Sequence, residues 1–561
     1  DDQRILQDVY VAEDDFAGAD DGEKVVVSVD RFDDRKASPE GRVLSVLGAA
    51  DDPNVRVLSL AMSMDVKADF PDDVEAEAEA IPTSLREQDL KRRTDLRDYP
   101  IFTIDPADAK DFDDAVHVLE KDNGNLEVGV HIADVSHYVE PGSAIDQEAL
   151  ERATSVYLVD RTIPMLPEKL SNQVCSLRPH EDKLAFSVIM EVTRQGEVVD
   201  HEITETVIHS QQRMTYDDAQ TYIDGGYPDH DVAKHVVRAN RLAKTLTKKR
   251  MREGSIDFGS DEVKVILDDD GHPKNIVRKR RMPANRLIEE LMLLANRTVA
   301  RHIGGSDFHE RVGGNGQYTH RDDPLPFIYR VHDNPDAEGI QKLAEYVQVF
   351  GHDLPLTNGN VTSEALGDLI DTVKGSPEEI VISRAALRAM SKAKYSVGNI
   401  GHFGLGFDYY SHFTSPIRRY PDLIVHRLLK HYARGGRPPS VDDLAQKCEH
   451  CSEQERNAEQ AERESVKLKQ VEYAASHVGD VFDGVVSGVT KFGVFVELSD
   501  LLVEGLVHVR EMNDDYYVYD ESTYTMRGEN TGKSYRPGDS VTVKIVDANV
   551  DKRQIDLVFE E

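Results

Sequence analysis

The sequence predicts a multidomain α+β protein in which a large mixed body is flanked by all-β barrels at both ends. Three observations carry this prediction. Residues 1–82 and 477–561 consist of short β-branched runs separated by turns, whereas residues 83–476 mix apolar strands with long amphipathic helices. A chain of 561 residues also exceeds what one hydrophobic core supports, so about three or four domains are expected.

Residues 1–82 are predicted to form a small barrel of the OB type. Three runs with strand character fall in this part, namely Lys24–Val29, Arg42–Gly48 and Val55–Leu60. Several short strands within so few residues are typical of OB barrels, although other small β domains share the pattern. The acid-rich segment Asp72–Ala80 then predicts a helical connector that leads into the body.

The body, residues 83–476, contains patterns of both strands and helices. Leu126–Ile132 and Ala185–Met190 have the β-branched and apolar character of buried strands. Pro283–Ile303 and Asp422–Tyr432 instead place apolar residues at intervals of three and four, which predicts helices with one apolar face. The mixture predicts an α+β domain.

From residue 477 onwards the pattern returns to short strands. They are Val481–Val486, Gly493–Leu498, Gly505–Val509, Ser540–Val546 and Gln554–Val558. Five such strands predict a second OB-type barrel. Barrels of this type bind single strands of nucleic acid by stacking bases on aromatic side chains. The candidate platforms are Phe482, Phe492, Phe495 and His508. The alternative is that at least one of these Phe residues is buried in the barrel core and does not stack on bases.

A concentrated group of acids lies in the segment Thr103–Ala115. Its members are Asp105, Asp108, Asp111, Asp113 and Asp114, with apolar residues on both sides. Carboxylates packed this closely repel one another, and burying them is costly unless cations compensate. Oxygen ligands of this kind suit Mg²⁺ or Mn²⁺. Two such ions held close together are a common device for cleaving phosphodiesters.

Composition alone could also produce this cluster. The chain has 104 acidic residues in 561, so four acids at one fixed spacing arise by chance about once along its length. The residues around the acids carry more information than the spacing. Tyr99–Ile104 before them has strand character, a Pro follows the first Asp, and apolar residues follow the last one. On the residues alone, solvated acids and metal ligands both remain open.

The charge balance is unusual for a protein that touches nucleic acid. Lys and Arg number 67 against 104 Asp and Glu, a formal net charge of −37, whereas phosphate binding favours basic patches. We hypothesise adaptation to high salt, in which an acidic surface keeps a protein soluble. Equal stability and activity without salt would contradict it. Two basic runs, Lys248–Arg252 and Arg278–Arg281, either line a phosphate path or neutralise neighbouring acids.

The sequence has no apolar run long enough to span a membrane and no signal-peptide pattern. Because the chain opens on Asp1-Asp2, we expect it to begin inside a longer protein. Three cysteines, Cys175, Cys448 and Cys451, do not make a disulfide framework, which indicates a reducing cytoplasm. Cys448 and Cys451 have the spacing of half a zinc site, but their charged, helical surroundings favour ordinary helix residues.

Five blocks, in this order along the chain, resemble the ribonuclease II / ribonuclease R family of processive exoribonucleases. They are Thr103–Ala115, Tyr157–Pro167, Leu170–Leu177, Asn285–Glu290 and His412–Leu423. The resemblance implies a cold-shock-type barrel at residues 1–82, an RNB catalytic domain at 83–476 and an S1-type RNA-binding barrel at 477–561. Family members usually carry two barrels before the body, and the single one here resembles the second of them.

The resemblance also implies a hydrolytic centre with two metal ions. The residues that would hold two Mg²⁺ ions, for which Mn²⁺ can substitute, are Asp105, Asp111, Asp113 and Asp114. Loss of Asp113 would abolish hydrolysis and spare RNA binding, and Asp108 has no counterpart. Arg418 resembles the arginine that contacts the scissile phosphate, and adjacent Arg419 is expected to contact RNA. Glu462 matches a glutamate near the reaction centre.

Four further residues are matched to RNA contacts by the same resemblance. Tyr157 and Phe258 correspond to two aromatics that clamp the stack of terminal bases. Tyr216 and Glu289 correspond to residues that contact the 3′-terminal nucleotide and favour ribose, whose 2′-OH is a hydrogen-bond donor. Glu290 is the alternative to Glu289, because the two acids are adjacent.

The implied function is processive 3′-to-5′ hydrolysis of RNA to nucleoside 5′-monophosphates, starting from a single-stranded 3′ end, by a cytoplasmic monomer. One alternative is a catalytically dead relative that only binds RNA, and the presence of all four matching Asp residues and Arg418 argues against it. A second alternative is a DNA-directed or endonucleolytic two-metal nuclease, against which Tyr216 and Glu289 argue through the resemblance.

Overall fold

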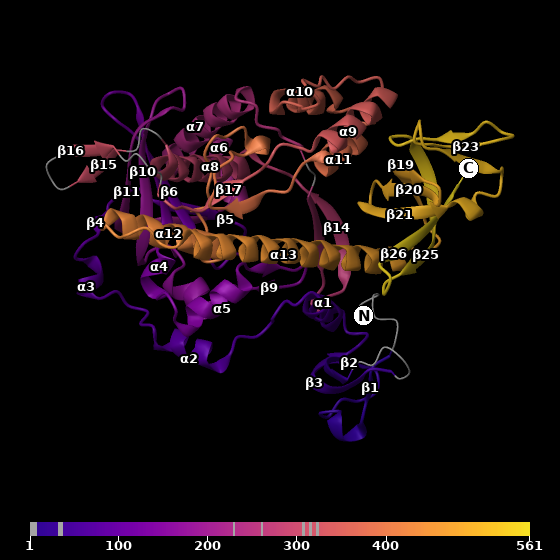
Figure 1. The fold of residues 1–561 in the computed structure, drawn as a ribbon, viewed down its shortest axis with the longest axis horizontal. Coiled ribbons are helices and arrows are strands. Elements are labelled where there is room, and N and C mark those ends of the chain that lie inside the picture. Colours follow the sequence, from indigo (N-terminus) through magenta and orange to yellow (C-terminus); the bar gives the residue numbers. More distant parts are fainter. Residues whose placement is uncertain are drawn as a thin grey trace.

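The computed structural model describes residues 8–31, 38–227, 230–259, 262–305, 309–312, 317–320 and 325–560. The helix α13 (Val441–Ala475), 35 residues long, runs along the long axis of the molecule and ends beside the C-terminal barrel (Figure 1). It contacts the N-terminal helix α1 (Pro53–Met62), strands of the body and strands of that barrel. This helix therefore joins the three parts of the chain.

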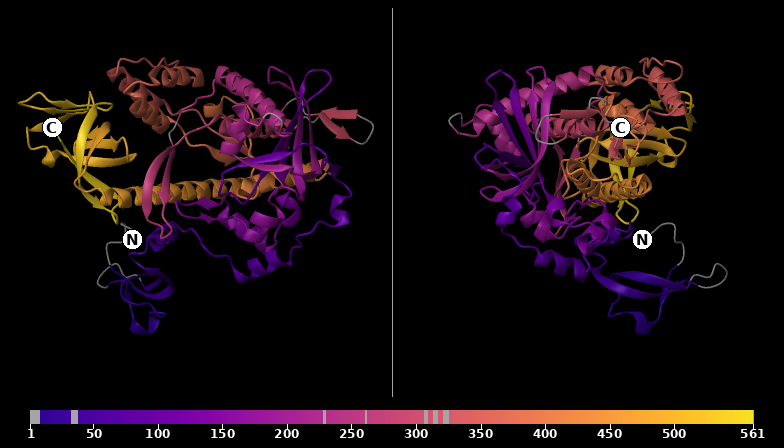
Figure 2. Two further views of the ribbon diagram at one scale, coloured as in Figure 1. Left: turned by 180° about the vertical axis from the view of Figure 1, so that it is seen from behind. Right: turned by 60° about the vertical axis from the view of Figure 1, so that its left-hand side comes forward.

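The N-terminal part forms a three-stranded sheet in the order β1-β3-β2, followed by α1. The strands are β1 (Tyr10–Val11), β2 (Glu23–Arg31) and β3 (Glu40–Ala49). Within residues 8–31 and 38–82 they do not close into a barrel. The sheet stands away from the body in both views of Figure 2, so contact with the rest of the molecule passes mainly through α1.

The predicted strand at Val55–Leu60 is wrong, because these residues belong to α1. Asp52 caps this helix by accepting hydrogen bonds from the backbone N–H groups of Asn54 and Val55, and Pro53 occupies its first turn. Val57 and Leu60 then face α13 and the strand β8 (Val156–Tyr157) in one apolar cluster. Tertiary packing on a three-residue spacing thus overrides the alternating pattern.

The body is built on a seven-stranded sheet in the order β12-β5-β6-β7-β10-β11-β4. Its strands are β4 (Thr94–Asp95), β5 (Phe102–Asp105), β6 (Asp114–Glu120), β7 (Leu126–Ala133), β10 (Asp182–Val192), β11 (Val198–His209) and β12 (Gln212–Thr215). The inner pairs are antiparallel, and the two edge pairs, β12 with β5 and β11 with β4, are parallel. The strands predicted at Leu126–Ile132 and Ala185–Met190 are confirmed.

Helices surround this sheet, and all of those named next except the short α3 contribute residues to the main hydrophobic core. They are α2 (Asp72–Ala80), α3 (Glu87–Leu90), α4 (Val135–Tyr138), α5 (Ala144–Arg152), α6 (Tyr216–Ile223), α7 (Ala233–Arg252), α8 (Pro283–Gly304) and α12 (Tyr420–Ala433). The helices predicted at Asp72–Ala80, Pro283–Ile303 and Asp422–Tyr432 are therefore confirmed. Among the residues described, no helix is both long and apolar enough to cross a membrane.

Smaller elements connect the parts of the body. Short paired strands are β8 with β9 (Thr162–Ile163), β13 (Glu262–Leu267) with β14 (Pro273–Lys279), β15 (His309–Val312) with β16 (Gln317–His320), and β17 (Tyr329–Val331) with β18 (Lys394–Ser396). Three helices, α9 (Ala337–Val349), α10 (Ser363–Val373) and α11 (Glu379–Ala389), form a lobe with its own apolar core.

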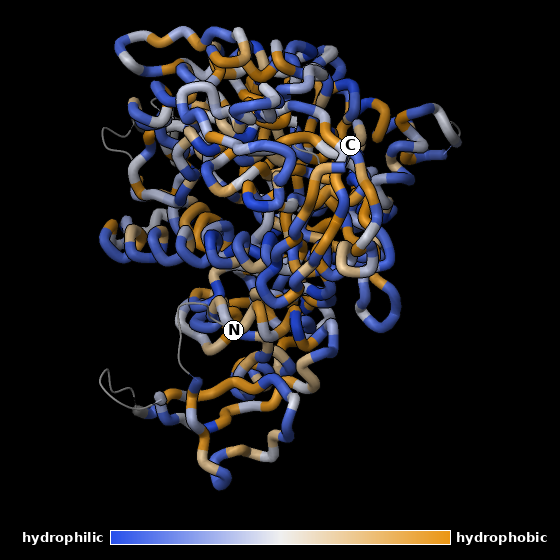
Figure 3. The backbone as a smooth tube through the Cα atoms, turned by 90° about the vertical axis from the view of Figure 1, so that its right-hand side faces the viewer, coloured by the Kyte–Doolittle hydropathy of each residue, from blue (hydrophilic) through white to orange (hydrophobic). Residues whose placement is uncertain are grey.

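The C-terminal part is a closed barrel of the predicted kind, with the strand order β19-β20-β21-β26-β25. Its strands are β19 (Val481–Thr490), β20 (Gly493–Leu498), β21 (Val503–His508), β25 (Ser540–Asn549) and β26 (Gln554–Phe559). A small sheet of β22 (Tyr517–Asp520), β23 (Thr525–Gly528) and β24 (Ser534–Tyr535) is inserted after β21. Figure 3 shows hydrophobic residues along the barrel strands and hydrophilic residues in the connections.

Candidate active site

Asp105 and Asp114 lie at adjacent ends of two neighbouring strands. Asp105 is the last residue of β5 and Asp114 is the first residue of β6, and these strands are antiparallel neighbours. The loop between them contains Asp111 and Asp113, so all four predicted carboxylates belong to one strand-loop-strand unit. The apolar residues of both strands are buried and anchor this unit in the core. Asp108, at the outer part of the loop, is exposed, as predicted for a solvated acid.

The four carboxylates have raised pKa values, and burial is the largest cause for each of them. Burial and repulsion from Asp114 raise the pKa of Asp105 to about 8. Burial raises the pKa of Asp114 to about 6, although the positive charge of Arg418 opposes the shift. The pKa values of Asp111 and Asp113 rise for the same reason against the same opposing charge. Burial and mutual repulsion therefore disfavour the charged forms of these carboxylates unless a cation is bound.

The donor set fits hard divalent cations. Asp105 Oδ2 and Asp114 Oδ2 are buried oxygens without a hydrogen-bond partner. Among the described residues, no group of three or more His, Cys, Asp or Glu side chains is arranged to hold an ion by itself. This arrangement is compatible with Mg²⁺, which usually binds through one or two carboxylates, several waters and the phosphates of a substrate. The carboxylates that would hold such ions are Asp105, Asp111, Asp113 and Asp114.

We expect Mg²⁺ to stabilise the protein more at pH 8 than at pH 5. The folded protein binds a proton at Asp105 up to about pH 8, whereas the unfolded chain loses it near the ordinary pKa of 3.8. Ionisation of Asp105 therefore lowers the stability of the metal-free protein as pH rises through this window, and a bound cation removes that cost. Calorimetric melting after EDTA treatment, with and without Mg²⁺ at constant ionic strength, measures the difference.

The variant Asp105→Asn is the control for this experiment. It removes the titrating group, so the Mg²⁺-induced rise in melting temperature should be smaller and should depend less on pH. If Mg²⁺ only screened the acidic surface, it would raise the melting temperatures of the unsubstituted protein and of Asp105→Asn by the same amount. An equal rise at both pH values in the unsubstituted protein would contradict the assignment.

Arg418 faces the acidic unit from the segment that leads into α12. Its Nε lies 3.5 Å from Asp113 Oδ2, and the neighbouring backbone N–H of Ile417 donates to Asp113 Oδ1 at 2.9 Å. Arg418 Nη2 donates to Ser415 Oγ at 2.9 Å, and the Arg418 carbonyl accepts from the N–H of Ser155 at 3.0 Å. The side chain is nevertheless 40% exposed. A guanidinium fixed in place with its outer face open is suited to receive a phosphate group.

Arg419 does not share this position, because its side chain is turned to a partner within the fold. Its Nε and Nη2 donate to Asp422 Oδ2 and Oδ1 at 2.9 and 2.7 Å. Asp422 is fully buried and also accepts from the N–H of Ser415 at 2.8 Å. The bidentate pair occupies the donor fork of Arg419 and fixes the segment that carries Arg418. Contact of Arg419 with RNA stays a prediction.

Tyr157 and Tyr216 each interact electrostatically with carboxylates of the acidic unit. Burial raises the pKa of the Tyr157 hydroxyl, and the charges of Arg418 and Asp111 act on it next. Burial likewise raises the pKa of Tyr216, with further contributions from Asp114 and Asp105. Tyr157 is on β8 and Tyr216 begins α6, so two separate elements bring aromatic rings to the site. These interactions place both rings within the electrostatic reach of the carboxylates, and their contacts with RNA stay a prediction.

The adjacent acids Glu289 and Glu290 on α8 point to different surroundings. Glu290 is buried and accepts from Thr247 Oγ1 at 2.9 Å and from Arg250 Nη2 at 2.7 Å. Glu289 has a side chain that is 33% exposed and pairs with Arg281. Glu290 is therefore a structural residue, and Glu289 is the one with a face available to a ligand. Arg250 and Arg281, from the two basic runs, neutralise these neighbouring acids.

Phe258 and Glu462 come from parts of the fold other than the acidic loop. Phe258 is half-buried and packs against the core of the α9–α11 lobe. Its neighbour Asp257 pairs with Arg281, which also holds Glu289. Glu462 is exposed on α13, three residues before Ser465, which accepts from the N–H of Val159 close to Tyr157. Asp257 and Ser465, which are close in sequence to Phe258 and Glu462, thus connect these two segments to those of Glu289 and Tyr157.

Two polar residues that hold the Arg418 segment were missed by sequence reasoning. Asn296 of α8 accepts from the N–H of Phe413 at 2.8 Å, and its amide N–H donates to Thr414 Oγ1 at 3.5 Å. Asp422 holds Ser415, as described above. The available signal was a polar residue within an apolar helical run, since such a residue needs buried partners. A polar residue in an apolar helix is thus predicted to be buried, but the sequence does not show which residue it contacts.

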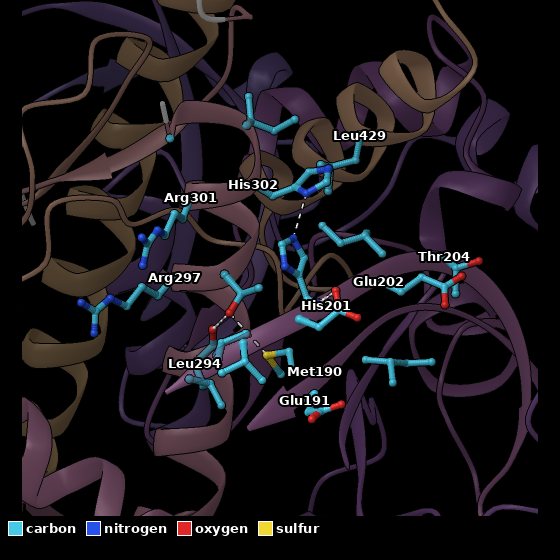
Figure 4. Close-up of a pocket in the computed structure, with 18 of the residues that line it drawn as sticks. Met190, Glu191, His201, Glu202, Thr204, Leu294, Arg297, Arg301, His302 and Leu429 are labelled. Atoms are coloured by element: carbon cyan, nitrogen blue, oxygen red, sulfur yellow. Dashed lines mark hydrogen bonds between the residues drawn. The ribbon is translucent and has the colours of Figure 1, made fainter. Parts of the chain in front are cut away.

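A cavity of about 1020 Å³ lies away from this site, between β10 and β11 on one side and α8 and the end of α12 on the other. Figure 4 shows His201 of β11 and His302 of α8 pointing toward each other within it, and their ring nitrogens are 2.9 Å apart. Its wall combines apolar side chains such as Met190 and Leu294 with charged ones such as Arg297. Glu290, the alternative to Glu289, lines this cavity with Lys249 and Arg250 of the first basic run, whereas the four carboxylates and Arg418 do not.

Comparison with known proteins identifies three domains in the same order as the fold. The RNB domain family matches residues 93–435, the cold shock domain family matches residues 1–71, and the S1 RNA binding domain family matches residues 476–559. Ribonuclease R of Thermotoga maritima is 43% identical over the whole chain, which spans 78% of that protein. Ribonuclease R 1 of Lactococcus lactis is 40% identical over 95% of the chain, which spans 65% of that relative.

A solved structure agrees with the sequence relatives. The structure of Mycoplasma genitalium RNase R in complex with ribose methylated single-stranded RNA has a TM-score of 0.89 and 27% identity, and the match covers 99% of this chain and 85% of that one. The fold and the site thus define an RNB-domain nuclease with cold-shock and S1 domains. Within this class, the chain belongs to the ribonuclease R family. It is an exoribonuclease, a hydrolase of phosphodiester bonds.

Proposed function

We propose that the protein is a processive 3′-to-5′ exoribonuclease that hydrolyses single-stranded RNA to nucleoside 5′-monophosphates with two divalent metal ions. The observation that carries this proposal is the cluster of four buried or half-buried carboxylates facing Arg418, with two buried oxygens that lack a hydrogen-bond partner. Solvated acids would have ordinary pKa values and water as partners. A site built to bind cations instead leaves its acceptors unpaired until the cations arrive.

In this mechanism the chain's own residues hold the reacting groups in place. Asp105, Asp111, Asp113 and Asp114 hold the ions. When bound, the ions supply activation of water and stabilisation of the leaving 3′-oxygen. Arg418 offers its guanidinium to the oxygens of the scissile phosphate, whose negative charge grows during the reaction. The ion pair between Arg419 and Asp422 keeps the Arg418 segment from moving during turnover.

The RNA contacts follow from the side chains around the carboxylates. Tyr157 and Phe258 would stack on the last bases of the strand, since aromatic rings bind every base with little sequence preference. Tyr216 and Glu289 would contact the 3′-terminal ribose, where a carboxylate accepts a hydrogen bond from the 2′-OH. Glu462 would lie at the edge of the site. The acidic surface and the three free, buried cysteines fit a cytoplasmic protein, and we propose that it acts there as a monomer.

The experiment that tests the function is a time course with Mg²⁺ and 5′-labelled single-stranded RNA, with DNA of the same sequence in parallel. We expect a ladder of shortening RNA that ends in a small oligomer, intact DNA, and 5′-monophosphates as the released product. RNA that is bound but not shortened would indicate a catalytically dead RNA-binding protein. Equal cleavage of DNA, or internal cuts, would indicate a different kind of two-metal nuclease, and 3′-monophosphates would contradict the mechanism.

A further inference from the structure

The loop that carries the acidic cluster is held by Ser176 on one side. Ser176 is fully buried and follows the π-helical turn Lys169–Val174. Its Oγ donates to the carbonyl of Lys110 at 2.7 Å and accepts from the N–H of Phe112 at 3.0 Å. The next residue extends the contact, because the N–H of Leu177 donates to the carbonyl of Phe112 at 2.9 Å. One hydroxyl therefore fixes the backbone on both sides of Asp111.

Arg213 holds the same loop at its other end. It lies on β12, which pairs in parallel with β5 and places Arg213 opposite Thr103. Its Nη2 donates to the carbonyls of Pro106 and Ala107 at 2.5 and 3.0 Å, the first two residues after Asp105. Its guanidinium also lies over the ring of Phe112, 5.6 Å from the centroid. Arg213 thus connects the beginning of the loop to the residue just before Asp113.

These two tethers act against a force that the acidic cluster itself generates. Asp105 is repelled by Asp114 and Asp111, and Asp113 is repelled by Asp111 and Asp114. Asp105 and Asp114 are fixed by their strands, but Asp111 and Asp113 lie in a loop that repulsion would open. Hydrogen bonds to the loop backbone hold these carboxylates together before any cation arrives.

We infer that Ser176 and Arg213 are positioning residues that keep the four carboxylates at the spacing needed to bind divalent metal ions. This inference rests on the proposed two-metal function. Neither residue belongs to the proposed set of metal ligands, and both act through the backbone of residues 106–112. Partners of this kind outside the ligand set commonly contribute about 10- to 100-fold to metal affinity. Their loss should therefore weaken metal binding more than RNA binding.

The test compares Ser176→Ala and Arg213→Met with the unsubstituted full chain. Mn²⁺ binding without RNA is measured by calorimetry and by the electron paramagnetic resonance signal of free Mn²⁺. We expect each variant to bind Mn²⁺ about tenfold or more weakly. In activity assays the Mg²⁺ concentration at half-maximal rate should rise by a similar factor, with an unchanged RNA dissociation constant. High Mg²⁺ should restore much of the rate, which general misfolding would not allow.

A matched control is available for the serine. Ser452 on α13 is also buried, and its Oγ donates to the carbonyl of Cys448 at 2.7 Å and accepts from the N–H of Tyr395 at 3.0 Å. Ser452→Ala removes the same two kinds of hydrogen bond away from the acidic loop. For the arginine, Arg297→Met removes a guanidinium that lies over Phe407. Neither control should change the Mn²⁺ affinity, even if it lowers the melting temperature.

Conservative replacement gives a second test. Arg213→Lys keeps a positive charge near Asp105 but lacks the planar fork that reaches two carbonyls. If charge alone mattered, this variant would bind Mn²⁺ normally, and the tethering role would be overturned. Normal Mn²⁺ affinity in Ser176→Ala and Arg213→Met would overturn the inference and leave the proposed function intact. If the unsubstituted protein bound no Mn²⁺ at all, the two-metal function itself would fail.

Discussion

Replacing Asp113 by Asn is expected to reduce hydrolysis by at least about 10³-fold, because a lost metal ligand removes several kcal/mol of transition-state stabilisation. RNA binding should remain. Asn keeps the oxygen that accepts from the N–H of Ile417, so the loop and the Arg418 segment stay joined. It removes the negative charge beside Arg418 Nε, which changes the chemistry of the site but not its packing.

The measurement is a single-turnover assay on labelled RNA, together with a binding titration on the same RNA. Asp108→Asn is the matched control, because Asp108 is an exposed acid in the same loop and should change neither value. Full hydrolysis by Asp113→Asn would show that the metal-site assignment is wrong. Loss of both RNA binding and the melting transition would instead indicate a structural role for Asp113.

The sequence allowed the C-terminal barrel to be predicted because each strand depends on its own alternating pattern. The strand expected at Gly493–Leu498 has these bounds, and its inward residues Val494 and Val496 are fully buried. The helix α1 could not be predicted in the same way. Its pattern at Val55–Leu60 alternates, and the helix depends on the Asp52 cap and on packing against α13, which follows far along the chain.

The acidic unit was predictable because its members are close in sequence and sit between two buried strands. What the sequence could not decide is which of two adjacent charged residues faces the site. Glu289 and Glu290 are neighbours on α8 and point about 100° apart, so one of them is turned away, whereas Arg419 is turned away by its ion pair with Asp422. Glu289 rather than Glu290, and Arg418 rather than Arg419, remain open to a ligand because the other member has a buried partner on a different element or turn.

Replacing Asp134 by Asn is expected to give the largest loss of stability, about 3–5 kcal/mol, because it leaves the buried cations Arg93 and Lys430 with only the more distant carboxylate of Glu205. Asp134 follows β7 and is fully buried, with Arg93 Nη2 2.6 Å from Oδ2 and Lys430 Nζ 2.5 Å from Oδ1. Burial alone would raise the pKa of Asp134, but Lys430 and Arg93 hold it well below its ordinary value of 3.8. Its charge therefore stabilises the fold above about pH 4 and loses this effect as pH falls further.

Calorimetric melting at pH 7 should show a lower melting temperature for Asp134→Asn, and the difference from the unsubstituted protein should shrink as pH falls below about 4. Asp182→Asn is the control in the same sheet. Asp182 pairs with Arg97 at 2.9 Å, but their side chains are 42% and 39% exposed, so its loss should cost about 0–1 kcal/mol. Equal losses of stability in the two variants would show that burial of Asp134 does not determine how much its ion pairs stabilise the fold. A difference that persists unchanged at low pH would show that Asp134 acts through packing rather than through its charge.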